Sequence, residues 1–597
     1  MLLNQNENQK NLNAADRKSY VGKIYNYGKD EFFDQFCDEA NLRILKNYDL
    51  LGKNYFHIHD LDAYGLTYNC LGFDIKNAFP FKDFENLDVT LKIVRTFDFM
   101  KELFAKMGNE QSGGMALVNF DMEFAEIFGK LGVDFKGNEN LFRACIRSMI
   151  LWCNNMHTRM GQTSYYVTFN LGLGTDDFSR FLTFTLIDEF EKAGELVFKP
   201  NIVFKVKQGV NRFKDDANFD LYEKALNCTA KKMIPTYLLC DCEEDKDVPA
   251  EKLSVMGCRT RVVDDIHGCT GSVGRGNIAN ISINLPLVAL QAVYNRTGWK
   301  IGNWDKIYKK PESIAEKFEN LKKYWLIIAK NVTKILLDRW EKTLQADSSL
   351  FPTNHEYKLW CEDMNKVGLA ETLKHGTLSI GFIGLSETIE ILTGKKYWQD
   401  DESYRLALDF VAFMRSFTDS LTKKYGINFS LLATAGENLS QNFTFLMEQL
   451  LEARFPEHGE EELDLPFLKK GFLTNSFHVD VDSGLSAIEK LRFEGPFHKY
   501  ANGGSISYVE LGEAPLGNAE ALAELAEIAI TSGVRYLGFN FPKDVCKKCG
   551  VSGIFDECPA CKSKNITRIR RVSGYLEILD GFTSVKKAEV ASRKENK

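Results

Sequence analysis

The sequence predicts a mixed α/β fold with a small cysteine-rich module near its end. Segments with helical periodicity alternate with short stretches rich in β-branched and aromatic residues over most of the 597-residue chain, a pattern typical of α/β architecture. The composition, 44% hydrophobic and 26% charged, is that of a globular chain with enough apolar material for a large core. The composition changes only after Phe541, where four cysteines lie close together.

The predicted helices have apolar residues spaced three and four positions apart, whereas the predicted strands are short and apolar. We predict helices over residues 31–48 (with Asp30 as N-cap), 91–107, 141–152, 312–346 and 518–532. We predict strands over residues 165–171, 201–206 and 280–285. Residues 1–18 are rich in Asn, Gln and Lys, and we expect them to be disordered.

The charge and the apolar runs exclude several classes of protein. The formal net charge of −7 provides no basic field for holding bulk nucleic acid. The polar N-terminal stretch lacks the apolar core of a signal peptide, and no apolar run is long enough to span a membrane. We therefore expect a cytoplasmic protein. Its 14 cysteines then indicate metal binding or thiol chemistry, because a reducing compartment disfavours a disulfide framework.

Two CxxC motifs near the end of the chain predict a metal site. Cys546 and Cys549 form the first motif, and Cys558 and Cys561 form the second. Each motif can place two thiolates on one ion, so the pair completes a tetrahedron and predicts a structural Zn²⁺ in a ribbon. Four unrelated buried cysteines are the alternative, but paired spacing is rare by chance. Taken alone, such a ribbon would indicate a module that binds nucleic acid or protein.

Gly574 follows the ribbon and lies among bulky residues. One interpretation is a turn or bulge that needs positive φ. The other is chemical: loss of a hydrogen from the glycine Cα leaves a radical that is delocalised over the flanking amide groups. Only glycine lacks a Cβ that would hinder planarity at that carbon.

Further motifs precede the ribbon along the chain. They are HIHD (57–60) with Asn69-Cys70, GG (113–114) with NFD (119–121), GQT (161–163), MGCRT (256–260), GRGN (274–277) with SINLP (282–286), TNSFHV (474–479) and GGSISYVE (503–510). With the CxxC pair and RVSGYL (571–576), this order resembles that of the anaerobic, or class III, ribonucleotide reductases of the glycyl-radical enzyme superfamily. The resemblance covers about residues 20–580.

The resemblance implies a fold and a division of the chain. We expect a ten-stranded α/β barrel, built from two antiparallel halves of parallel strands, over residues 19–541, with a finger loop that carries a cysteine to its centre. The zinc ribbon would cover residues 542–566, and the glycyl-radical loop and tail residues 567–597. Because the catalytic pattern begins by about residue 20, we expect a form without the N-terminal ATP-cone, a domain of about a hundred residues. Two positions depart from the usual pattern: Ser573 stands where relatives often have Cys, and Gly276 replaces a common Asn.

The resemblance also implies an activity, the anaerobic reduction of ribonucleoside triphosphates to deoxyribonucleoside triphosphates for DNA synthesis. Gly574 would store the radical, and Cys258 would form the thiyl that takes the 3′ hydrogen of the ribose. Cys70 would deliver a proton and a hydrogen atom as the 2′-hydroxyl leaves as water. Asn277 would hydrogen-bond the ribose hydroxyls, although an Asn in a glycine-rich loop can also be a simple turn residue.

The triphosphate group of the substrate also needs a binding site. We expect it at Thr474, Asn475, Ser476, Gly503, Gly504 and Ser505. The glycine-rich residues 271–276 lack the GxxxxGK[ST] pattern of a P-loop.

Two further pairs of side chains could be metal ligands, but neither pair is convincing. His57 and His59 could chelate a metal, but no third ligand is evident, and Cys240 with Cys242 is a weak pair without partners. The other cysteines outside these motifs are interpreted as core or surface thiols: Cys37, Cys145, Cys153, Cys228, Cys269 and Cys361.

The implied partners are the ribonucleoside triphosphate substrate, nucleoside triphosphate effectors, a radical-SAM activating enzyme with an iron–sulfur cluster, and a second copy of the chain in a homodimer. We expect neither nucleic acid nor membrane as partners, and no flavin, haem or NAD. Formate is the expected reductant, and a thioredoxin-like dithiol is its competitor.

Two alternatives stay open at this point. One is a glycyl-radical enzyme of the formate-lyase or diol-dehydratase type, although an acyltransferase needs two adjacent cysteines and Cys258 stands between Gly257 and Arg259. The other is a non-enzymatic zinc-ribbon binding protein whose large domain is a scaffold.

Overall fold

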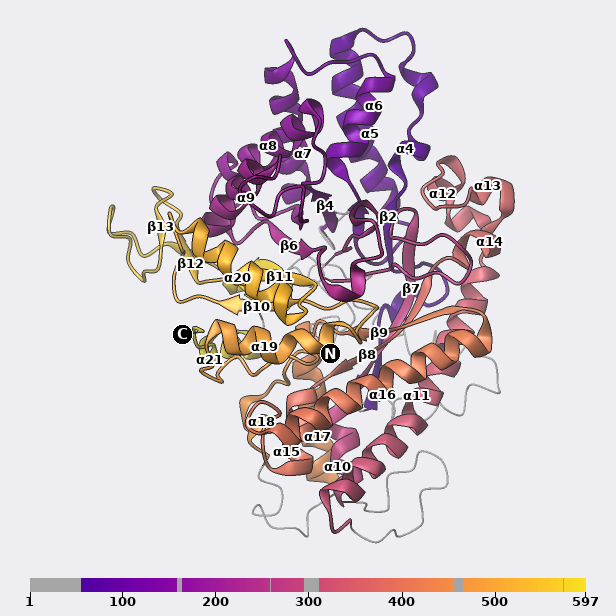
Figure 1. Cartoon of the computed structure of the whole chain (residues 1–597), viewed down its shortest axis with the longest axis vertical. Coiled ribbons are helices and arrows are strands. Elements are labelled where there is room, and N and C mark those ends of the chain that lie inside the picture. The colour runs from indigo at the N-terminus through magenta and orange to yellow at the C-terminus, as the bar shows by residue number, and fades with distance from the viewer. Residues whose placement is uncertain are drawn as a thin grey trace.

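The computed structural model (Figure 1) describes residues 55–157, 164–257, 259–294, 311–454, 465–572, 574–582 and 584–596. Most of its strands lie in one 11-stranded sheet with the order β10-β11-β6-β5-β4-β3-β2-β7-β8-β9, and β1 pairs with β7 outside that path. These strands are β1 (Phe56–Ile58), β2 (Cys70–Phe73), β3 (Met115–Leu117), β4 (Val167–Leu171), β5 (Asn201–Val206), β6 (Thr236–Leu239), β7 (Arg275–Asn284), β8 (Thr377–Ile383), β9 (Asn428–Ala433), β10 (Ser507–Glu510) and β11 (Tyr536–Asn540).

The sheet consists of two parallel halves that meet at antiparallel junctions. Strands β2 to β6 pair in parallel in chain order, as do β7, β8 and β9, and β10 pairs in parallel with β11. The two junctions, β2 with β7 and β6 with β11, are antiparallel. A bridge between Leu432 and Gly504 joins β9 to the segment before β10 and closes the sheet into a barrel. The predicted barrel of two antiparallel halves is therefore confirmed.

Helices cover the outside of the barrel. In Figure 1, α5 to α9 lie beside the strands of the first half, and α10, α11, α15 and α16 lie on the opposite side of the molecule. The helices are α4 (Ile75–Ala78), α5 (Val89–Met107), α6 (Phe120–Lys130), α7 (Glu139–Asn155), α8 (Asp177–Lys192), α9 (Phe219–Lys232), α10 (Leu285–Tyr294), α11 (Ile314–Leu344), α12 (Pro352–Glu356), α13 (Met364–Val367), α14 (Leu369–Leu373), α15 (Leu385–Thr393), α16 (Asp401–Tyr425), α17 (Glu437–Arg454), α18 (Pro466–Lys470), α19 (Ala487–His498), α20 (Ala519–Ser532) and α21 (Ser584–Ser592).

Helix α5 shows why these segments fold as predicted. The Asp88 carboxylate caps its N-terminus by accepting a hydrogen bond from the Leu91 N–H. Its buried residues include Ile93, Phe97 and Met100, which recur three and four positions apart and form one apolar face. Among the described helices, none is both long and apolar enough to cross a membrane.

The strand that contains Asn277 differs from the prediction. We predicted a strand over residues 280–285, but β7 begins at Arg275 because its first residues pair with β2. A Cβ on Gly276 would lie 2.0 Å from the carbonyl oxygen of Cys70, so this glycine permits close pairing and is not a loop residue. The predicted helix over residues 31–48 and the disorder predicted for residues 1–18 lie outside the described residues.

A second, four-stranded sheet stands at the end of the chain, with the order β13-β12-β14-β15. Its strands are β12 (Lys543–Cys546), β13 (Ser552–Gly553), β14 (Ile566–Val572) and β15 (Tyr575–Ile578). In Figure 1, β12 and β13 project from one side of the molecule. The CxxC motifs and Gly574 therefore belong to one continuous sheet.

Candidate active site

The finger loop lies between β6 and β7, and its tip is a hairpin. Met256 and Thr260 bond through both backbone groups, at 2.8 and 3.1 Å. Cys258 lies between them in the sequence but outside the described residues.

The first half of the barrel holds one side of this hairpin. The Asn170 side chain on β4 donates to the carbonyl oxygen of Val255 at 3.2 Å and accepts from the Val255 N–H at 3.2 Å. Asn201, at the start of β5, donates to the carbonyl oxygen of Gly257 at 3.1 Å. A Cβ on Gly114 would lie 2.7 Å from the Cα of Gly257. The finger therefore packs directly against the barrel wall.

The second half of the barrel holds the other side. The Arg261 N–H donates to the carbonyl oxygen of Gly503 at 3.0 Å. A Cβ on Gly504 would lie 2.0 Å from the carbonyl oxygen of Arg259, which requires a glycine at that position. Burial and the positive charge of Arg259 lower the pKa of His478 well below its usual value, so this imidazole is neutral. The finger thus crosses the barrel between its two halves.

Cys70 is the first residue of β2 and faces the finger. Its buried Sγ accepts a hydrogen bond from the Gly114 N–H at 3.2 Å and lies 2.8 Å from Asn69 Oδ1, to which the thiol donates. Thr260 Oγ1 lies 4.0 Å from the same sulfur. A Cβ on Gly113 would approach this sulfur to 2.6 Å. The glycine pair therefore leaves space for the Cys70 thiol beside the finger.

Asn277 stands opposite Cys70 in the β2–β7 register, so the two side chains project from the same face of the sheet. Its amide nitrogen donates to Thr377 Oγ1 at 3.0 Å and to Ser379 Oγ at 2.8 Å. Its Oδ1 is buried and has no hydrogen-bond partner among the described residues. A buried acceptor without a partner is costly, and this one is free to accept a hydrogen bond from a hydroxyl of a bound ligand.

Thr474, one of the residues predicted to bind the triphosphate, lies in acidic surroundings. Its hydroxyl is 2.7 Å from Glu387 Oε1 and 2.8 Å from Asp480 Oδ1, and its N–H also bonds Glu387. Burial raises the pKa of Glu387, as does the charge of Asp480. Lys396 contacts Asp480 at 3.0 Å and partly balances these carboxylates. The Thr474 hydroxyl is thus engaged within the protein.

The other predicted triphosphate residues divide into two groups. Gly503 and Gly504 bond β9 through their backbone and close the barrel, and Ser505 Oγ lies 2.8 Å from His498 Nδ1. Asn475 Oδ1 accepts from the backbone N–H before α17. The backbone of Ser476 accepts from the first residue of α15 at 3.0 Å, and its buried Oγ has no partner in the part of the chain that the structure describes. Among the six residues predicted to bind the triphosphate, Ser476 therefore has a side-chain hydroxyl that can bond a ligand.

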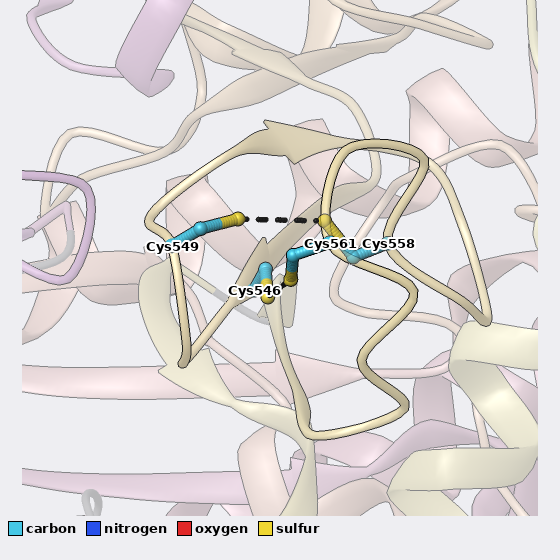
Figure 2. A group of neighbouring side chains, drawn as sticks. All are labelled: Cys546, Cys549, Cys558 and Cys561. Atoms are coloured by element: carbon cyan, nitrogen blue, oxygen red, sulfur yellow. Dashed lines mark hydrogen bonds between the residues drawn. The ribbon is translucent and has the colours of Figure 1, made fainter.

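The four ribbon cysteines converge (Figure 2). The Sγ atoms of Cys546 and Cys561 are 3.5 Å apart, as are those of Cys549 and Cys558, and all four lie within 4.8 Å of one another. These separations are too long for disulfides. Thiolates about 2.3 Å from a tetrahedral Zn²⁺ are roughly 3.8 Å from one another. The four thiolates therefore fit a zinc ion.

The two CxxC turns have the same backbone. The Gly550 N–H donates to the carbonyl oxygen of Cys546 at 2.9 Å, and the Lys562 N–H donates to that of Cys558 at 2.9 Å. Both residues have left-handed φ values, 76° for Gly550 and 57° for Lys562. Each of the two turns therefore directs its two sulfurs toward the same point.

Gly574 lies in the turn that joins β14 to β15. Val572 pairs with Tyr575 next to this turn, and Ser573 is outside the described residues. Gly574 is buried and has a φ of 130°, a value that favours glycine. Arg571 donates to the carbonyl oxygen of Gly574 at 3.0 Å and to that of Met233, next to the barrel strand β6, at 2.5 Å. The Arg571 guanidinium therefore bridges the carbonyl oxygen of Gly574 and that of Met233, which precedes β6.

Comparison with known proteins identifies the family. The family model described as anaerobic ribonucleoside-triphosphate reductase matches residues 14–595. The chain belongs to this family. It is 28% identical to the anaerobic ribonucleoside-triphosphate reductase of Escherichia coli over 90% of this chain and 76% of that protein, and 31% identical to that of Salmonella typhimurium over 74% and 60%. The fold resembles the Thermotoga maritima anaerobic ribonucleotide reductase solved with dATP and CTP, with a TM-score of 0.66, 15% identity, and coverage of 96% of this chain and 91% of that one.

Family membership decides between the functions that the sequence left open. The chain is an anaerobic ribonucleoside-triphosphate reductase, and neither the formate-lyase or diol-dehydratase type nor a binding scaffold is needed to explain it. Sequence reasoning did not find the anchors Asn170, Asn201 and Arg571. Asn170 and Asn201 lie in no motif, and Arg571 opens RVSGYL without any sign of its partner Met233, because each of the three side chains acts through a backbone carbonyl that the sequence pattern does not reveal.

Proposed function

We propose that this reductase stores its radical on Gly574 and transfers it to Cys258 on the finger, and that Cys258 and Cys70 act on the ribose together. The observation that carries the proposal is the pairing of Cys70 with Asn277 on the barrel wall that faces the finger hairpin. A sugar held there would have one thiol on the finger and another on β2. The free Oδ1 of Asn277 would accept a hydrogen bond from a ribose hydroxyl.

The proposed sequence of steps balances hydrogen atoms and electrons. The Gly574 radical takes the hydrogen of the Cys258 thiol, and the resulting thiyl takes the 3′ hydrogen of the ribose. The C2′–O bond then breaks, and the 2′-hydroxyl leaves as water with a proton relayed by Cys70, while the 3′-hydroxyl loses its proton, so that a 3′-ketone with a radical at C2′ remains. The Cys70 thiol gives its hydrogen atom to C2′, and formate gives its hydrogen atom to the resulting Cys70 thiyl and then one electron, with a proton, to the ketone, and leaves as carbon dioxide. Cys258 finally returns the 3′ hydrogen, and its thiyl takes the hydrogen of Gly574 to restore the glycyl radical.

The ribbon would hold a structural Zn²⁺ through Cys546, Cys549, Cys558 and Cys561. Its thiolates would fix the end of β14 near Ile566, whereas Gly574 follows the other end of that strand. The role proposed for the ribbon is to position the glycine loop. A radical-SAM activating enzyme with an iron–sulfur cluster would remove the Gly574 hydrogen, and the chain would act as a homodimer regulated by nucleoside triphosphates.

For the triphosphate we propose Ser476 as the main side-chain donor of the six predicted residues. It lies at the N-terminus of α15, where backbone N–H groups and the helix dipole favour an anion. Asn475, Thr474, Gly503, Gly504 and Ser505 would shape this part of the site, since the contacts described above occupy most of their polar groups.

Paired cysteine variants test the mechanism. Cys258→Ser and Cys70→Ser should both abolish deoxynucleotide formation, because a serine O–H bond is much stronger than a thiol S–H bond. In Cys258→Ser the glycyl signal should be stable with substrate present, and 3′-deuterated substrate should be recovered unchanged. In Cys70→Ser the ribose radical still forms, so free base should be released while the glycyl signal decays.

Cys145→Ser, on α7 outside the site, is the matched control and should retain activity. If Cys70→Ser is silent and Cys258→Ser releases base, the two roles are reversed. Turnover that is supported by a dithiol and not by formate would contradict the proposed reductant, while leaving the roles of the cysteines intact.

A further inference from the structure

A second group of metal-ligating side chains lies away from the ribbon. The Sγ atoms of Cys269 and Cys361 and a ring nitrogen of His375 are within 4.8 Å of one another. The three residues come from the loop after the finger, from the segment before α13, and from the residues just before β8. His375 is buried, and both cysteines are half-buried free thiols. Three segments that are distant in the sequence thus bring two sulfurs and an imidazole together.

The imidazole of His375 has one engaged ring nitrogen and one free one. Its Nδ1 lies 2.7 Å from Asp265 Oδ2, while its Nε2 is buried and has no hydrogen-bond partner among the described residues. The same carboxylate accepts from the Cys269 N–H at 2.9 Å and from Asn428 Nδ2 at 2.8 Å through its other oxygen. A carboxylate that holds one ring nitrogen of a histidine, leaving the other as a lone-pair donor, is the usual support of a metal-bound imidazole.

We propose that Cys269, Cys361 and His375 Nε2 form a second zinc site, distinct from the ribbon. Two thiolates and an imidazole are the donor set that Zn²⁺ prefers, and binding would release the two thiol protons. Water or His267 completes the coordination. The exposed ring of His267 stands edge-on to that of His375, with 5.8 Å between their centroids.

The site joins the finger loop to the strands that carry the ribose-binding side chains. The Cys361 N–H donates to the carbonyl oxygen of Gly274 at 2.8 Å, and a Cβ on Gly274 would lie 2.3 Å from that nitrogen. Arg275, the first residue of β7, donates to the carbonyl oxygen of His375 at 2.9 Å. Asn277 follows in β7 and bonds Thr377, the first residue of β8. A metal here therefore fixes the starts of β7 and β8 and the return of the finger.

Metal content of the full chain tests the proposal without reference to turnover. Protein purified without oxygen and without added chelator should contain a second equivalent of zinc beyond that of the ribbon. Cys361→Ser should lose one equivalent, Cys558→Ser should lose the other, and the double variant should lose both. Cys145→Ser is the matched control and should retain both equivalents. A wild-type chain whose single equivalent disappears in Cys558→Ser would overturn the proposal.

Cobalt distinguishes loss of the site from loss of the fold. With the ribbon disabled by Cys558→Ser, added Co²⁺ should give thiolate-to-metal charge-transfer bands in the near ultraviolet and the strong visible bands of tetrahedral Co²⁺. A further Cys269→Ser substitution, in a loop, should weaken the charge-transfer bands while the circular dichroism is unchanged. The absence of these bands, or a Cys269–Cys361 disulfide in peptides mapped from the anaerobic protein, would contradict a metal site.

Discussion

The two hairpins that carry the proposed radical residues are held in different ways. The finger hairpin of Met256 and Thr260 is fixed from both halves of the barrel, by side-chain amides on one side and by close-packed glycines on the other. The hairpin of Gly574 belongs to the small C-terminal sheet. Arg571 links this turn to Met233 before β6, and Lys543 on β12 donates to the carbonyl oxygen of Lys231 on α9.

The difference follows from what each hairpin must do. A thiyl that takes a hydrogen from the ribose must be held in position, because small displacements of reacting atoms are costly. The proposed radical glycine would instead have to be reached by an activating enzyme. The four ribbon cysteines lie toward one end of β14 and Gly574 follows its other end, and these ends are roughly 20 Å apart for a strand of this length.

The largest expected effect comes from removing the ribbon metal. Cys558→Ser should lose zinc and abolish formation of the glycyl radical, because the strand that presents Gly574 loses its fixed end. The barrel should still fold, and nucleotide binding should be retained. Electron paramagnetic resonance after activation and metal analysis check both points. A full-strength radical signal in the metal-free variant would contradict the positioning role.

Weakening the hydrogen bonds that hold the finger should lower kcat without lowering the yield of the glycyl radical. Asn170→Ala removes both hydrogen bonds to Val255, and misplacement of the finger by about 1 Å should lower kcat by about 10²-fold. The glycyl signal should reach the wild-type level, since Gly574 lies in another sheet. Asn227→Ala, exposed on α9, is the control. Loss of the radical in Asn170→Ala would mean that the two hairpins are not independent.

Weakening the contacts of the loop that carries Gly574 should instead lower the yield of the glycyl radical. Arg571→Gln removes the charge behind two hydrogen bonds, and loss of even one such bond is worth about 1.5–3 kcal/mol, so the radical yield should fall by at least about tenfold. Hydrogen exchange should increase over residues 566–578 and not in the barrel. Arg568→Gln, on the same strand but paired with the exposed Asp556, is the matched control. Equal exchange rates in both variants would show that Arg571 does not hold the loop.

The smallest effect is expected at the contact between the finger and β2. Thr260 Oγ1 is 4.0 Å from Cys70 Sγ, a weak contact because sulfur is a poor hydrogen-bonding partner. Thr260→Val should therefore lower kcat by only about threefold, which corresponds to less than 1 kcal/mol. Thr260→Ser should behave as wild type. A loss of several hundredfold in Thr260→Val alone would assign this hydroxyl a direct part in the reaction.

The sequence predicted those parts of the molecule whose signals are local. Strand β5 covers residues 201–206 as predicted, and the helix predicted over 518–532 is α20 with a difference of one residue at its start. The ribbon was recognised because each pair of cysteines lies within one turn. The barrel was predicted from family resemblance alone, because periodicity does not determine how strands are ordered in a sheet.

The parts that could not be predicted depend on contacts between distant segments. Cys269 and Cys361 were interpreted as core or surface thiols, since nothing in the sequence connects them to each other or to His375. The strand predicted over residues 280–285 does not include Gly276, but the lack of a Cβ at Gly276 lets β7 approach the backbone of Cys70. In both cases the decisive neighbour comes from another part of the fold.

The site of cleavage by oxygen tests the central proposal, the radical on Gly574, most directly. Dioxygen adds to a carbon radical and breaks the backbone at that residue. Activated protein exposed to air should therefore lose the segment beginning at Gly574, as mapped by mass spectrometry, whereas protein that was never activated should remain intact. Cleavage at another residue, or an activated chain that survives air unbroken, would contradict the proposal.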